Sequence, residues 1–165
     1  MSTTWHKKAL EFGPVLVVSS ERATANRILE VLRGFGPVPE IMWAGSAGQA
    51  WRVLQSTSAK LMLVEQAGRV IDGLSLTRQL RRSSLPCRRV PVIMLSDEAT
   101  VGALREAQAA GASEFLVRPF SFIDLGRRLD AICAPDRQWI ETEIYVGPDR
   151  RRFNSAMKGP NRRQR

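Results

Sequence analysis

Four short apolar runs in this chain are each followed by, or end in, residues that could take part in chemistry. Glu65 ends KLMLVE, Ser96 ends PVIMLS, Arg118 follows SEFLV, and Ser19 with Ser20 follows PVLVV. A carboxylate, a guanidinium group and several hydroxyls can together form a charge pair that is supported by hydrogen bonds. Whether they do so depends on whether the fold brings the ends of these runs together.

The apolar runs alternate with longer amphipathic segments, as they do in parallel sheets whose strands are joined by helices. The expected strands are 14–19, 38–44, 60–65, 91–96 and 113–117, and the expected helices are 21–35, 46–58, 72–84, 98–110 and 121–133. Ser46 and Ser121 are candidate N-caps, and Gly111 is expected to end a helix. The pattern predicts the α/β class, a doubly wound parallel sheet with helices on both faces.

A doubly wound sheet places its functional site at the carboxyl ends of its strands. The residues expected at that edge are Ser19, Ser20, Ala44, Glu65, Ser96 and Arg118. The alternation of elements therefore predicts a fold class and the location of a site, but it does not define a reaction.

Composition and length set limits on the kind of protein. A length of 165 residues favours one domain with a short additional segment. No apolar run is long enough for a membrane helix. Cys87, Cys133 and His6 share no motif, so neither a disulfide framework nor a zinc site is expected. We expect a cytoplasmic protein with an N-terminal segment (1–12), a main domain (13–134) and a basic C-terminal extension (135–165).

The net charge of +9 is concentrated in that extension. Residues 147–165 hold seven basic residues and one acidic residue, a net +6, and Gly-Pro-Asx-Arg-Arg occurs there twice. The candidate anion-binding residues are Arg150, Arg151, Arg152, Arg162 and Arg163. Three hypotheses remain open: a solvated tail, an arm that docks through residues 139–146 on a partner or a second copy, and a site for a cyclic dinucleotide or another polyanion. No DNA-reading motif is present.

Several motifs occur in a particular order and spacing. They are VLVVSSERAT (15–24), the segment from Glu65 to Asp72-Gly73, VIMLS (92–96) and GASEFLVRPF (111–120). With these motifs, residues 14–134 resemble the CheY-like receiver domains of response regulators. The resemblance implies a flavodoxin-like (βα)5 fold with strand order 2-1-3-4-5. It also implies phosphorelay (two-component) signalling, contact with a histidine kinase or another signalling protein, and no enzymatic turnover.

In such domains two acidic residues and an acceptor aspartate hold Mg²⁺, and a lysine and a hydroxyl bind the phosphoryl group. Here Ser19 and Ser20 stand at the acidic positions, Glu65 at the acceptor position and Arg118 at the lysine position, whereas Ser96 keeps the hydroxyl. Two uncharged hydroxyls are poor ligands for a hard divalent cation, so we expect no cofactor and no tight Mg²⁺ binding.

The carboxylate of Glu65 reaches about 1.5 Å further than that of an aspartate. A Glu65–Arg118 pair, with Ser96 donating a hydrogen bond, would imitate the phosphorylated site and predicts a stand-alone pseudo-receiver in one permanent state. Two alternatives stay open: an inactive site in which Glu65 is only salt-bridged or solvated, and a genuine phosphoacceptor. Phe115 stands at the family's rotamer-switch position, with a plain core role as the alternative. The face built from 98–133 is the family's usual dimer or partner surface.

Overall fold

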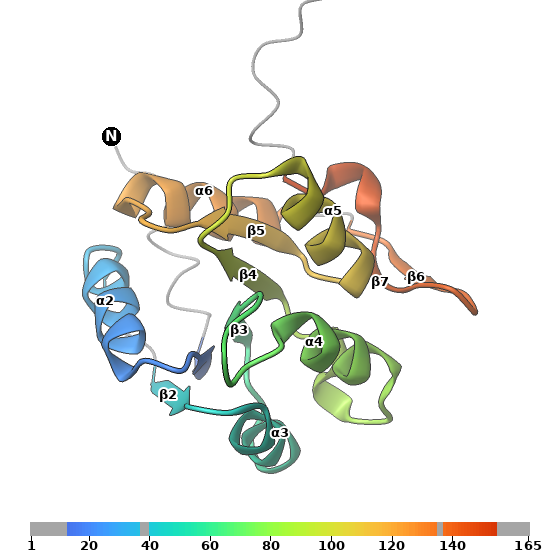
Figure 1. Ribbon diagram of the computed structural model, residues 1–165, viewed down its shortest axis with the longest axis horizontal. Helices are drawn as coiled ribbons and strands as arrows, with labels where there is room; N and C mark the ends of the chain where they lie inside the picture. Colours follow the sequence, from blue (N-terminus) through green and yellow to red (C-terminus); the bar gives the residue numbers. More distant parts are fainter. Residues whose placement is uncertain (1–12, 37–39, 135–136, 155–165) are drawn as a thin grey trace, which may run out of the picture.

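The computed structural model describes residues 13–36, 40–134 and 137–154. Figure 1 shows a central sheet flanked by helices. The strands are β1 (Val15–Val18), β2 (Ile41–Ala44), β3 (Leu61–Glu65), β4 (Val92–Ser96), β5 (Glu114–Val117), β6 (Trp139–Glu141) and β7 (Val146–Pro148). The helices are α2 (Arg22–Arg33), α3 (Ala47–Ser56), α4 (Gly73–Arg82), α5 (Val101–Ala110) and α6 (Phe122–Cys133), with short 3₁₀ turns η2 (Pro86–Arg89) and η3 (Arg150–Arg152).

The main sheet is parallel throughout and has the order β2-β1-β3-β4-β5. The predicted fold class, strand order and five βα pairs are therefore confirmed. Because all five strands run the same way, their carboxyl ends meet at one edge of the sheet. That edge receives Ser19 and Ser20 from β1, Glu65 from β3 and Ser96 from β4.

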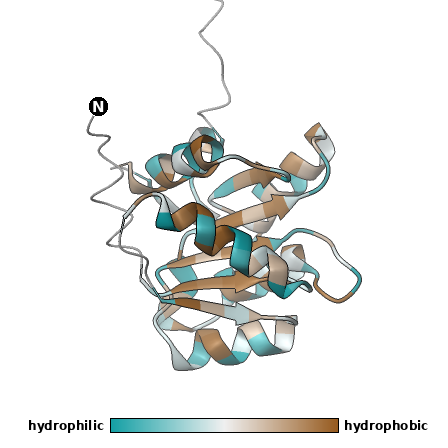
Figure 2. Cartoon of the chain, turned by 90° about the vertical axis from the view of Figure 1, so that its left-hand side faces the viewer, coloured by the Kyte–Doolittle hydropathy of each residue, from teal (hydrophilic) through white to brown (hydrophobic). Residues whose placement is uncertain are grey.

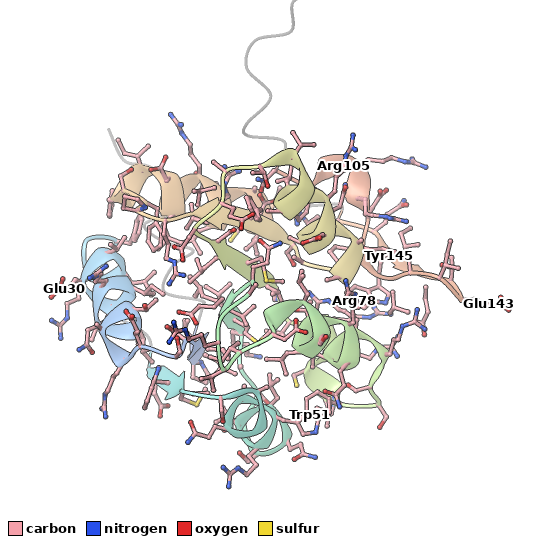
Figure 3. All side chains as sticks on the ribbon, in the orientation of Figure 1. Glu30, Trp51, Arg78, Arg105, Glu143 and Tyr145 are labelled. Atoms are coloured by element: carbon pink, nitrogen blue, oxygen red, sulfur yellow. The ribbon has the colours of Figure 1, made fainter. Side chains whose placement is uncertain are left out.

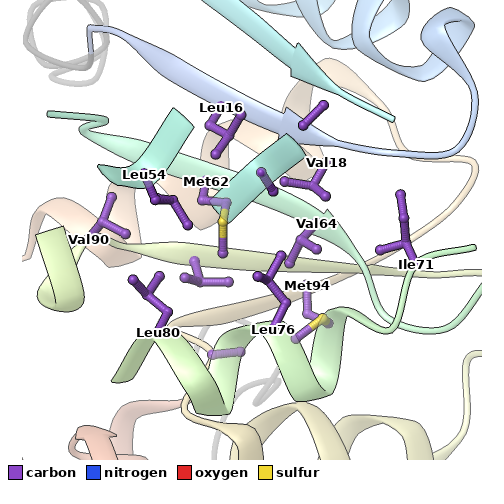
Figure 4. Close-up of a cluster of buried hydrophobic side chains, with 14 of the residues drawn as sticks. Leu16, Val18, Leu54, Met62, Val64, Ile71, Leu76, Leu80, Val90 and Met94 are labelled. Carbon is purple, nitrogen blue, oxygen red and sulfur yellow. The ribbon is translucent and has the colours of Figure 1, made fainter. Parts of the chain in front are cut away.

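Apolar side chains alternate between the two faces of each strand. Leu16 and Val18 enter the core under α3, α4 and α5, whereas Val15 and Val17 enter the core under α2 and α6. Figure 4 shows the first of these cores. Figure 2 shows the apolar strands between helices that carry both hydrophilic and hydrophobic residues. Both faces are covered, which explains why the strands read as nearly continuous apolar runs.

Local capping sets the helix boundaries. The side chains of Ser46 and Ser121 accept hydrogen bonds from the third helical residue, as expected, and Gly111 ends α5 with φ of 94°. Thr100 caps α5 through its hydroxyl, so this helix begins at Val101 and not at residue 98. The other expected elements agree with the structure to within about two residues at each end, apart from residues 37–39, which lie outside the described residues.

Residues 137–154, called the C-terminal arm below, fold back onto the main domain. Strands β6 and β7 form an antiparallel hairpin, and β7 lies against α4. For these residues the solvated-tail hypothesis is wrong, because the hairpin packs on its own chain with Tyr145 buried, whereas Ile144 near its tip is 87% exposed. Among the described residues, no helix has the length and apolar character needed to cross a membrane.

Candidate functional site

The carboxylate of Glu65 is the centre of the polar site at the carboxyl edge of the sheet. Its Oε1 accepts hydrogen bonds from Ser19 Oγ at 2.6 Å and from Arg118 Nη1 at 3.1 Å. Its Oε2 accepts one from the Ser20 backbone N–H and one from Ser20 Oγ, both at 3.1 Å. The side chain of Glu65 is only 5% exposed. Four donors from two other strand ends therefore surround a nearly buried carboxylate.

Arg118 links this buried carboxylate to the protein surface. Its second terminal nitrogen, Nη2, lies 2.9 Å from Oδ2 of Asp97, whose side chain is 73% exposed. One guanidinium group thus bridges a buried and an exposed carboxylate, a geometry that a lysine ammonium could not fix in the same planar way.

Burial and hydrogen bonding act in opposite directions on Glu65. Burial raises the pKa of its carboxyl group, but the hydrogen bonds from Ser19, Ser20 and Arg118 together outweigh it, so the pKa lies below its ordinary value of 4.5. Hydrogen bonds to a carboxylate favour its charged form. Glu65 is therefore ionised at neutral pH.

The two serines have a role that the sequence analysis missed. We treated Ser19 and Ser20 as positions where an acidic pair is absent, but their hydroxyls are donors to Glu65. The signal was present in the chain, because a serine pair after one strand and a glutamate at the end of its neighbour suit each other as donors and acceptor.

Ser96 does not join the network around Glu65. Its Oγ accepts a hydrogen bond from the backbone N–H of Glu98 at 3.1 Å. The donors to Glu65 are Ser19, Ser20 and Arg118, so the expected donation from Ser96 is not made. The pair itself is present, as expected, and Ser19 and Ser20 supply the hydrogen bonds instead.

Two further residues hold the surroundings of Glu65 in place. Trp43 is 36% exposed, and its Nε1–H donates to the carbonyl of Ser19 at 2.9 Å. Gln66, which the sequence analysis passed over, is buried, and its Nε2 donates to the carbonyl of Ala103 at 2.9 Å. The ends of β1 and β3 are thus tied to β2 and α5 respectively.

A pocket of about 620 Å³ opens beside the charge pair. Its lining includes Glu65, Arg118, Arg27, Glu30 and Phe120. Four acidic residues and two basic residues line the pocket in all, since Glu21 and Asp97 also belong to the lining.

The remaining predicted residues lie apart from Glu65. Phe115 is 3% exposed and packs in the core under α3, α4 and α5, so its role as a switch stays a prediction. In the arm, the Arg150 guanidinium lies 4.2 Å from the centre of the Tyr145 ring, and the side chain of Arg151 is 90% exposed. Arg162, Arg163 and the side chain of Arg152 lie outside the described residues. Binding of a cyclic dinucleotide or another polyanion there stays a prediction.

The fold and the strand-end site define the class of protein. Residues 15–130 match the response regulator receiver domain family, and the chain belongs to that family. It is a receiver domain of two-component signalling.

Relatives and solved structures agree with this assignment. The two-component response regulator-like protein PRR37 of rice (Oryza sativa subsp. indica) is 31% identical over 107 residues, which make up 64% of this chain and 14% of the rice protein. The probable methanogenesis regulatory protein FilR2 of Methanothrix harundinacea is 25% identical over 140 residues, covering 81% of this chain and 88% of that protein. The structure of chemotaxis protein CheY4 from Vibrio cholerae has the same fold, with a TM-score of 0.64, 23% identity and coverage of 72% of this chain and 97% of that one.

The groups at this edge do not suit Mg²⁺, the cation that receiver domains hold. The hydroxyls of Ser19 and Ser20 are uncharged and donate to Glu65, whose carboxylate is also paired with Arg118, so the site lacks the free anionic oxygens that a hard divalent cation prefers. The part of the chain that the structure describes contains no group of three or more His, Cys, Asp and Glu side chains placed to hold a metal ion.

Proposed function

We propose that this domain is a pseudo-receiver that works in one state without phosphorylation and acts by protein–protein contact, with no catalytic turnover. The observation that carries the proposal is the set of four hydrogen bonds on Glu65. A phosphoacceptor needs a carboxylate oxygen that is free to attack phosphorus. Both oxygens of Glu65 are instead buried and occupied by donors from the same chain.

The charge pair supports a phosphate-like role for Glu65. The side chain of Glu65 is one methylene longer than that of the usual acceptor aspartate, and its carboxylate lies 3.1 Å from the guanidinium group of Arg118. A charge-assisted contact of this kind is stronger than a neutral one and resists rearrangement when it is buried. The Ser96 hydroxyl accepts from the Glu98 backbone N–H and does not join the pair, so the proposed likeness to a phosphorylated site rests on the charge of Glu65 alone. The expected partner is a histidine kinase or another signalling protein.

Treatment with acetyl phosphate and Mg²⁺, followed by intact-protein mass spectrometry, tests whether Glu65 accepts phosphate. We expect no acid-labile adduct of about 80 Da on the wild-type chain. A variant with Ser19→Asp, Ser20→Asp and Glu65→Asp restores three carboxylates and is expected to gain an Mg²⁺-dependent adduct. An adduct on wild-type protein that disappears in Glu65→Gln would instead establish a genuine phosphoacceptor.

A backbone NMR comparison separates a phosphate-like charge from an inert site. If the Glu65–Arg118 pair holds one state of the domain, Glu65→Gln is expected to shift amide resonances along β5 and α5 as well as next to the substitution. Asp97→Asn serves as the control, because it removes only the exposed partner of Arg118. Shifts confined to the neighbours of residue 65 would contradict the phosphate-like role and leave an inert site.

A further inference from the structure

In the part of the chain that the structure describes, strand β5 lies at one end of the main sheet and pairs only with β4. An edge strand presents backbone N–H and C=O groups on its outer side, and these groups can pair with the edge of another chain. The hairpin of β6 and β7 forms a separate sheet, so it does not extend the main sheet beyond β5.

Both ends of the C-terminal arm reach the backbone of this edge. The Phe115 N–H donates to Oδ1 of Asn154 at 2.9 Å, and the Ser113 carbonyl accepts from Nη1 of Arg137 at 2.7 Å. Asn154 is 4% exposed and has a positive φ of 50°, a conformation that asparagine adopts more readily than most residues. A carboxamide and a guanidinium group thus take the positions that a neighbouring strand would use.

Burial of charge fixes the contact that Arg137 makes with this edge. Arg137 also pairs with Glu114, whose side chain is fully buried and lies 3.4 Å from Nη1 of Arg128. A buried carboxylate is costly unless cations compensate it. The arm therefore supplies one of the two charges that Glu114 needs.

The middle of the arm is packed closely against the end of α5. A Cβ atom on Gly111 would lie 2.8 Å from the Val146 carbonyl, so only glycine allows the arm to come this near. Tyr145 is 4% exposed, and its hydroxyl donates to the Pro148 carbonyl at 2.7 Å. In Figure 3, Tyr145 lies beside α5, whereas Glu143 marks the outer tip of the hairpin.

A buried arginine of the main domain completes this contact. Arg81 is 1% exposed and donates to the carbonyls of Gly111 at 2.9 Å and Val90 at 2.7 Å. Its guanidinium group lies 5.3 Å from the centre of the Trp139 ring, within the range of a cation–π contact. The arm is thus part of the packed molecule from residue 137 to residue 154.

We propose that the C-terminal arm is an intramolecular cover of the β5 edge, and that it prevents this chain from pairing with a second copy through that strand. A second copy is the occupant that the edge itself favours, because two identical edges related by a two-fold axis are self-complementary. The arm caps the edge with side chains and adds no sixth strand, so pairing stops there. This inference concerns a surface away from Glu65 and does not depend on the function proposed for that site.

Phe153→Ala combined with Asn154→Ala tests the cover in the full chain. The double variant removes the carboxamide on Phe115 and a ring that packs against the core, without leaving a buried charge unpaired. In dilute samples we expect hydrogen exchange at the Phe115 amide to speed up by about tenfold or more. As concentration rises to about 500 µM, we expect light scattering to show dimers and Phe115 exchange to slow again, because the second copy then protects the edge. The wild-type chain and the control Arg151→Ala, with its exposed side chain, should stay monomeric with a protected Phe115 amide.

Two results would overturn the proposal. One is an unchanged Phe115 exchange rate in the double variant, which would mean that the arm does not cover the edge. The other is fast exchange at every concentration with no change in mass relative to wild type, which would mean that the edge does not pair. If circular dichroism shows that the double variant is unfolded, the same two measurements on Asn154→Ala alone decide between these outcomes.

Discussion

Glu65 remains charged in a site that excludes most water because donors of its own chain replace the lost hydration. Ser19 and Ser20 supply three of these hydrogen bonds and Arg118 the fourth. Hydrogen bonds to a charged group contribute more to stability than neutral ones, and leaving such a group unpaired is costly. In the function proposed above, the same contacts that stabilise the fold also keep the carboxylate from acting as a nucleophile.

The lowered pKa of Glu65 predicts how stability depends on pH. The stabilisation is fully present above the unfolded-state pKa near 4.5 and is lost as pH falls through the lower folded-state pKa. We expect Glu65→Gln to reduce the free energy of unfolding by about 1–3 kcal/mol at neutral pH. In urea titrations the gap to wild type should narrow below about pH 4.5.

Comparison with this variant also removes the effect of the other buried carboxyl group. Burial raises the pKa of Glu114 despite the nearby Arg137 and Arg128, so the contribution of Glu114 to stability is lost as pH rises. Wild type and Glu65→Gln both contain Glu114, so this effect cancels when their free energies of unfolding are compared. A gap between wild type and Glu65→Gln that persists unchanged into acid would contradict the lowered pKa of Glu65.

At the scale of elements, the site depends on how closely α4 approaches the end of β3. The Gly73 N–H donates to the Gln66 carbonyl at 3.1 Å, which brings the start of α4 against the backbone of Glu65. A Cβ on Gly73 would lie 1.9 Å from the Glu65 carbonyl oxygen, a distance that only backbone movement could relieve. Side chains with a β-carbon are therefore excluded where this helix begins.

Gly73→Ala is expected to lower the free energy of unfolding by at least about 2 kcal/mol, because the packed backbone cannot move without strain. Thermal unfolding followed by circular dichroism provides the measurement. The matched control is Gly48→Ala in α3, where no atom lies within 4 Å of the new Cβ. There alanine should raise stability by up to about 1 kcal/mol through its helix propensity. Equal effects at the two positions would show that the close approach is not the cause.

At the scale of the whole molecule, the arm and the main domain share buried polar contacts. Arg81 joins α4 to the hairpin residue Trp139, and Asn154 joins the end of the arm to β5. Contacts of this kind couple the stability of the parts they join. We therefore expect the arm to unfold together with the receiver domain.

Tyr145→Phe tests this coupling without changing packing volume. The substitution leaves the Pro148 carbonyl without its phenolic donor and should cost about 1–2 kcal/mol. If the arm is part of one cooperative unit, the urea midpoint of the receiver helices, measured by circular dichroism, falls. An unchanged midpoint, with faster hydrogen exchange confined to β6 and β7, would show that the arm opens separately.

The fold class and the edge at which Glu65, Ser96 and Arg118 would lie could be predicted from the residues alone, and the strand order from the family resemblance. The fold class and the location of the edge follow from local patterns, since apolar periodicity, capping residues and glycine stops act over a few neighbouring residues. The charge pair of Glu65 and Arg118 was also predictable, because the carboxyl ends of parallel strands meet at one edge of the sheet.

The partner that each polar group takes could not be predicted from the sequence. Ser96 accepts a hydrogen bond from the backbone of Glu98, and Ser19 and Ser20 donate to Glu65. The indole of Trp43 donates to the carbonyl of Ser19. The return of the arm onto β5 depended on contacts between residues far apart in the chain, such as Asn154 with Phe115. Hydrogen-bond partners are chosen by geometry within a few tenths of an ångström, and no local pattern carries that information.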